Sequence, residues 1–171
     1  MVNIATASII LPVQTAKLVG GAVTNGSPTQ GAAIDGGADL WKLLFDTTTA
    51  EGAVWQFRMP TNFSSTLVSK IQYAMTSAVS AATVAFDIAI WAIADGEDID
   101  TPSFDTVTST GAITVPATPA GKLDTISTDL TNEDSIAAGE LCVVQLSRDV
   151  ALDDGAGDAE VVSFSLDYTT T

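Results

Sequence analysis

Short apolar runs alternate with polar positions along most of the chain, and turn residues separate one run from the next. In residues 83–94, the apolar Val84, Phe86 and Ile88 alternate with Ala85, Asp87 and Ala89. A period of two residues is typical of a β-strand, whose successive side chains point to opposite faces. Further strand-like runs lie at 40–45, 54–59, 67–75, 106–115, 122–130, 141–148 and 161–168. About eight short strands predict an all-β sandwich or barrel.

The alternation also predicts which side chains share a face of a strand. Trp55, Phe57 and Met59 share one face of their strand, and Trp55 is expected in the core. Asp87 and Trp91 fall on the face opposite Phe86, and a lone carboxylate is costly to bury, so that face is expected to contact water. Trp91 is therefore the best candidate for an exposed contact aromatic, and burial in a subunit interface is the open alternative.

Two other segments lack this alternation. Residues 1–39 are rich in Ala, Gly, Thr and Ser, with Gly and Pro breakers, and they predict an extended N-terminal arm. Such an arm is either an ordinary flexible tail or a segment that orders on a neighbouring subunit. Residues 40–171 then form the sandwich domain. A short helical turn is expected at 132–138, with Asn132 as its cap.

Composition excludes several classes of function. The formal net charge of the 171 residues is −15, which repels phosphate backbones, so nucleic acid is not an expected partner. No apolar window is long enough to span a membrane, and the N-terminus lacks the basic region of a signal peptide. Without any histidine, Ser-His and Cys-His catalysis is impossible. The single cysteine, Cys142, lies in an apolar run and is expected to be a buried hydrophobe.

Two acidic loops are the candidate sites for chemistry. Carboxylates in such loops are usually solvated turn formers, but several together can also bind Ca²⁺. The candidate calcium ligands are Asp95, Glu97, Asp98 and Asp100 in one loop and Asp153, Asp154 and Asp158 in the other. No pair of carboxylates has the positional support that a glycosidase needs, so the chain is not expected to be an enzyme, and no cofactor is expected.

Several stretches resemble a β-sandwich domain of tailed-bacteriophage virion proteins. They run from Leu40 to Tyr168 and comprise residues 44–60, the acidic turn 94–100, the link 118–123, and the segments 135–140, 148–149 and 153–161. The resemblance implies a jelly-roll fold, usually a homotrimer, on a capsid surface or in a head or tail fibre.

Because no fibre shaft accompanies the domain, the resemblance favours a capsid decoration (cement) protein on the outer surface of the phage head, assembled in the host cytoplasm. Its partner would be the major capsid protein, and the N-terminal arm would supply contacts between subunits. The alternative is a head or tail fibre module that binds a host-surface carbohydrate through loop carboxylates and an exposed aromatic such as Trp91.

Overall fold

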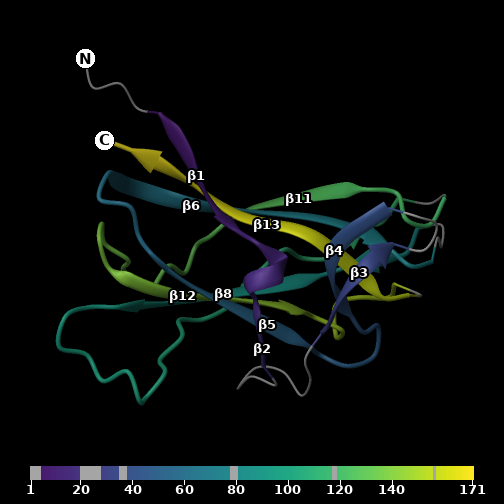
Figure 1. The fold of residues 1–171 in the computed structure, drawn as a ribbon, viewed down its shortest axis with the longest axis horizontal. Coiled ribbons are helices and arrows are strands. Elements are labelled where there is room, and N and C mark those ends of the chain that lie inside the picture. Colours follow the sequence, from purple (N-terminus) through teal and green to yellow (C-terminus); the bar gives the residue numbers. More distant parts are fainter. Residues whose placement is uncertain (1–4, 20–27, 35–37, 78–80, 117–118, 156) are drawn as a thin grey trace.

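The computed structural model describes residues 5–19, 28–34, 38–77, 81–116, 119–155 and 157–171. Most of the strands in these ranges form two antiparallel β-sheets that pack face to face, with loops at both ends (Figure 1). The all-β, antiparallel sandwich predicted from the alternation is confirmed. Within these ranges there is no helix long and apolar enough to cross a membrane.

The larger sheet has the strand order β11-β6-β13-β4-β3, and β1 also pairs with β13 on the side where β4 lies. Its strands are β1 (Thr6–Leu11), β3 (Thr29–Ile34), β4 (Ala38–Phe45), β6 (Phe63–Met75), β11 (Asp124–Asp129) and β13 (Ala159–Thr170).

The second sheet has the order β2-β5-β12-β8-β9. Its strands are β2 (Lys17–Val19), β5 (Gly52–Arg58), β8 (Phe86–Ile93), β9 (Thr108–Ser109) and β12 (Leu141–Arg148). A separate two-stranded sheet is formed by β7 (Thr83–Val84) and β10 (Ile113–Thr114). One 3-10 turn, η1, covers Val13–Thr15.

The core lies between the two sheets and contains aromatic contacts that cross from one to the other. Trp55 of β5 packs on Phe164 of β13 with ring centroids 5.1 Å apart. Phe86 of β8 meets both Phe45 and Tyr73 at about 6 Å, in near-perpendicular geometry. Burying each such side chain contributes on the order of 1.5–3 kcal/mol, so these contacts hold the sheets together.

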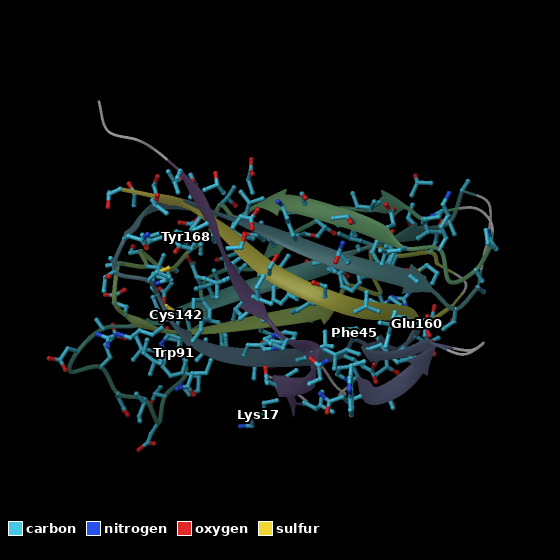
Figure 2. The ribbon with its side chains drawn as sticks, turned by 45° about the horizontal axis from the view of Figure 1, so that its top comes forward. Lys17, Phe45, Trp91, Cys142, Glu160 and Tyr168 are labelled. Carbon is cyan, nitrogen blue, oxygen red and sulfur yellow. The ribbon has the colours of Figure 1, made fainter. Side chains whose placement is uncertain are left out.

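Cys142 lies on the inward face of β12 and is fully buried, as the sequence predicts. Burial raises the pKa of its thiol to about 12, because the thiolate would lie in apolar surroundings. The Cys142 side chain therefore contributes to the packing of the core. It lies toward the same end of the sandwich as Trp91, whereas Phe45 and Glu160 lie toward the other end (Figure 2).

The described parts of residues 1–39 differ from the expected arm, because they pair within the sandwich. Strand β1 runs antiparallel to β13 from Thr6 opposite Thr169 to Leu11 opposite Phe164. Leu11 and Val13 are buried in the core. The arm prediction missed these contacts because Pro12 directly follows the short apolar run at 9–11, and the sequence does not show that β13 pairs with this run. Residues 1–4, 20–27 and 35–37 of the expected arm lie outside the described residues.

The helical turn predicted at residues 132–138 is wrong. Asp134 and Ser135 have φ angles of 50° and 55°, and the amide of Ile136 donates to the carbonyl of Glu133 at 3.1 Å. Two successive residues with positive φ inside a four-residue hydrogen-bonded turn make a type I′ turn, which a right-handed helix cannot contain. The Asp134 carboxylate instead accepts the amide of Ala92 at 2.9 Å, which fixes the turn against the end of β8.

Replacing Ser135 with glycine should stabilise the protein by about 0.5–1 kcal/mol, because glycine adopts a positive φ without steric cost. Urea denaturation measures the change. The matched control is Ser127→Gly in strand β11, where glycine only adds flexibility and should destabilise. Equal destabilisation by both substitutions would contradict the strain assigned to Ser135.

Candidate ligand-binding cleft

Three neighbouring strands of the five-stranded sheet end at the same level and supply the floor of a cleft. Leu141 of β12 lies opposite Arg58 of β5 on one side and opposite Ile93 of β8 on the other. Residues that pair across a pleated sheet share a face. Because the next residue, Cys142, points into the core, this row of three belongs to the outer face of the sheet.

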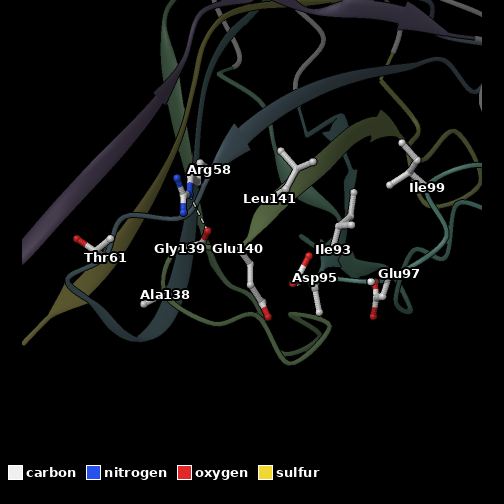
Figure 3. Close-up of a pocket in the computed structure, with 12 residues that line it drawn as sticks. Arg58, Thr61, Ile93, Asp95, Glu97, Ile99, Ala138, Gly139, Glu140 and Leu141 are labelled. Carbon is white, nitrogen blue, oxygen red and sulfur yellow. Dashed lines mark hydrogen bonds between the residues drawn. The ribbon is translucent and has the colours of Figure 1, made fainter.

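Loops on both sides of this row border an open cleft of about 790 Å³ (Figure 3). That volume lies within the range of small-molecule sites. One wall is the acidic loop after β8, and the other is the turn before β12. Besides the floor, the lining consists of Thr61, Ala94, Asp95, Gly96, Glu97, Ile99, Ala138, Gly139 and Glu140.

Arg58 is held in place through its side chain. Its Nε donates to the carbonyl of Gly139 at 2.7 Å, and the Gly139 amide donates to the carbonyl of Met59 at 3.0 Å (Figure 3). Gly139 has a φ of +85°, which other residues rarely adopt. In the described part of the chain, Arg58 forms no ion pair, and its terminal nitrogens make no hydrogen bond. The guanidinium can thus donate to a ligand from a fixed position.

The rest of the cleft combines acceptors with apolar surface. The carboxylates of Asp95, Glu97 and Glu140 line it, while Ile99 and Leu141 are 65% and 36% exposed. An isoleucine that is exposed to that degree beside a pocket can pack against an apolar surface of a ligand. The cleft can therefore bind a neutral molecule that carries both hydroxyl groups and C–H faces.

A second hollow of about 380 Å³ adjoins the cleft and shares Glu97 with it. It is lined by Trp91, Glu97, Asp98, Thr101, Ser103 and Asp134. Trp91 pairs with Phe104 at a centroid distance of 6.1 Å. In the sheet, Trp91 lies one outward-facing position before Ile93 along β8, so the two hollows follow one another along the same strand.

A third hollow of about 410 Å³ is less suited to a ligand. It lies toward the other end of the sandwich, where Glu160 is found (Figure 2). Its cation, Lys42, is already ion-paired with the buried Glu160. The cleft around Arg58 is the better candidate, since its cation is free of such a partner among the described residues.

No protein-family model matches the chain, and no curated protein matches its sequence. Solved structures match it in architecture. A family 35 carbohydrate-binding module from Cellvibrio japonicus Abf62 is 13% identical with a TM-score of 0.48, over 96% of this chain and 99% of that one. A family 11 carbohydrate-binding module from Clostridium thermocellum is 16% identical with a TM-score of 0.42, over 97% and 89%.

A bacteriophage protein is also among the matches. The enzymatically active domain of tailspike protein 4 of bacteriophage CBA120 is 8% identical with a TM-score of 0.44, over 98% of this chain but only 19% of that one. At such identities and TM-scores these likenesses describe a β-sandwich and carry no argument about function.

The expectation that Trp91 is an exposed aromatic is wrong, because its side chain is only 7% exposed. Trp55 is buried in the core as predicted, and the exposed tryptophan is Trp41 of β4, at 47%. Trp91 nevertheless lines the second hollow with the small part of its side chain that remains exposed.

The expectation that the outer face of β8 contacts water is also wrong, because another segment of the chain covers that face. Ala89 and Trp91 on that face are buried, and Oδ1 of Asp87 is buried without a hydrogen-bond partner among the described residues. The segment after residue 103 covers this face and edge: Phe104 packs on Trp91, and the amide of Asp105 donates to the carbonyl of Ile90 at 2.9 Å. Desolvation raises the pKa of Asp87.

The first acidic loop is part of the cleft region. Asp95 and Glu97 line the cleft, and Glu97 and Asp98 line the second hollow. Asp98 uses its oxygens within the loop, accepting the amide of Asp100 at 2.9 Å and the hydroxyl of Thr101 at 3.2 Å. The exposed Asp100 lines neither hollow.

The second acidic loop is organised around a buried arginine. Asp153 accepts from Nε of Arg148 at 2.6 Å, and both side chains are essentially inaccessible to solvent. Asp154 accepts the amide of Thr83 at 2.6 Å, and Asp158 accepts the amide of Thr47 at 3.2 Å. Each of these carboxylates therefore bonds to a different protein donor, and a guanidinium supplies the positive charge in this loop.

Calcium should not stabilise the protein. In the described ranges, no three acidic or thiol side chains come together in a way that could hold a metal ion. We expect the midpoint of thermal unfolding to stay unchanged when millimolar Ca²⁺ is added, with EDTA as the control. A rise of the midpoint with calcium concentration would contradict this, since a ligand that binds only the folded state raises its stability.

Sequence reasoning missed Arg58, Glu140 and Leu141 as site residues. A signal was present: Arg58 is one of only six basic residues and stands at the end of a strand, directly before Met59 and Pro60. What the sequence could not show is that the ends of β5, β8 and β12 lie side by side in one sheet.

Proposed function

We propose that this chain is a carbohydrate-binding β-sandwich domain that recognises a glycan in the cleft around Arg58. The observation that carries the proposal is a guanidinium held by Gly139, with donors free among the described residues, in a cleft that carboxylates and exposed aliphatic side chains also line. Sugars offer hydroxyl groups that both donate and accept, beside C–H faces that pack on apolar side chains. The cleft offers a partner for each of these groups.

Binding without hydrolysis fits the distribution of perturbed carboxyl groups. A glycosidase needs one carboxylic acid with a raised pKa beside a second carboxylate. Among the described residues, the carboxyl groups whose pKa values burial raises are Glu51, Asp87 and Glu133. None of them lines the cleft or the adjoining hollow, which supports a binding role.

Of the two virion roles predicted from the resemblance, the alternative fits this proposal. In that role the chain is a head or tail fibre module that binds a host-surface carbohydrate. Capsid decoration by a homotrimer bound to the major capsid protein stays a prediction from the resemblance. Co-sedimentation of the purified domain with phage heads would test that prediction separately.

A glycan array tests the proposal directly. The wild-type domain should bind a subset of immobilised glycans, and free glycan of the same structure should compete with the binding. Arg58→Met should lose the signal, because it removes the guanidinium and keeps most of the apolar stem. Absence of any glycan binding by the wild-type domain would refute the proposed function.

A further inference from the structure

The cleft and the adjoining hollow lie in line on one face of the five-stranded sheet. The cleft covers the row Arg58, Leu141 and Ile93, and the hollow reaches Trp91 on the next outward row of β8. The loop between residues 95 and 101 separates them, and Glu97 lines both sides of this wall. A ligand longer than one sugar unit can therefore contact both hollows at once.

Both hollows are acidic. Beside the cleft carboxylates, the second hollow is lined by Asp98 and Asp134, and Arg58 is the only cation that lines either of them within the described residues. The net charge of −15 adds a long-range field of the same sign. Uronic acids and other anionic sugars are repelled by such a surface, whereas neutral sugars are not.

The second hollow is also rigidly built. The Asp134 carboxylate accepts the amide of Ala92, and the Asp134 amide donates to the carboxylate of Asp105 at 3.0 Å. Trp91 is held against Phe104. A preformed hollow binds with little loss of conformational entropy, which suits it to act as a binding subsite.

From this arrangement we infer that the ligand is a neutral oligosaccharide that occupies two subsites, one at Arg58 and one at Trp91, across the wall formed by Glu97. The inference rests on the proposed function and adds to it the class and the minimum length of the glycan. Sugar rings in the second subsite meet Trp91 and the hydroxyl groups of Thr101 and Ser103.

The test compares Ser103→Leu with wild type on an array that carries neutral and uronic acid ladders, from single sugars to hexasaccharides. Ser103 is exposed and its side chain forms no hydrogen bond in the described structure, so leucine fills part of the hollow without breaking a contact. Thr106→Leu, in the same loop outside both hollows, is the matched control.

Wild type and Thr106→Leu should bind neutral oligomers about tenfold or more tightly than single sugars, the gain expected from one or two added hydrogen bonds. Ser103→Leu should lose that gain and retain the affinity for single sugars. Equal affinity at all lengths, equal loss at all lengths in Ser103→Leu, or a preference for uronic acids would overturn the inference. If wild type binds no glycan at all, the proposed function itself fails.

Discussion

Arg148→Met should destabilise the domain by about 3–5 kcal/mol, the cost of removing one partner of a buried ion pair. The Arg148 side chain is fully buried. Its Nε pairs with Asp153, and its Nη1 donates to the carbonyls of Phe45 and Gly157 at 3.1 and 2.9 Å. Without the guanidinium, the Asp153 carboxylate remains buried with no compensating charge. Urea denaturation monitored by tryptophan fluorescence measures the loss.

Two further variants separate the buried charge from other effects of the substitution. Lys70→Met removes the half-exposed partner of the buried Asp167 and should cost less than Arg148→Met, because water reaches the Lys70 ammonium and the Ser8 hydroxyl still donates to the Asp167 carboxylate. Adding Asp153→Asn to Arg148→Met should recover part of the loss, because it neutralises the stranded carboxylate. A loss in Arg148→Met no larger than in Lys70→Met would contradict the role assigned to Arg148.

Arg58→Met should weaken glycan binding about 10- to 100-fold, the loss expected for hydrogen bonds from a charged donor. The side chain is exposed, and its one described hydrogen bond is to the Gly139 carbonyl, so stability should change little. Isothermal titration calorimetry with a glycan selected on the array measures the affinity.

Lys122→Met is the matched control for Arg58→Met. It removes the same charge from an exposed position that lines neither the cleft nor the adjoining hollow. It should leave glycan affinity unchanged, because the effect of Arg58 is local and geometric. An equal loss in both variants would show that net charge, and not the cleft, controls binding.

The strands were predictable because their alternation is strong. The run at 141–148 matches β12 at both ends, and Trp55 lies in the core, as predicted from the alternation in 54–59. In each case the apolar residues recur at every second position, which leaves one arrangement that buries them.

The predictions from the sequence fail where contacts between distant segments determine the structure. The alternation in β8 places Trp91 opposite the core, but it cannot show that the segment around Phe104 folds over that face. Likewise, the short segment of β1 forms a strand because β13 offers an unpaired edge beside β4. The cleft residue Arg58 gains its role only from the register with Leu141, which pairs residues 83 positions apart.

Chemical-shift mapping by two-dimensional NMR tests the central claim most directly. When a glycan selected on the array is added to the labelled domain, backbone amides at Arg58, Ile93, Glu97, Glu140 and Leu141 should shift together along one binding curve. The larger sheet, including Lys42 and Glu160 in its separate hollow, should not respond. Shifts confined to the larger sheet would contradict the assignment of the cleft as the glycan site.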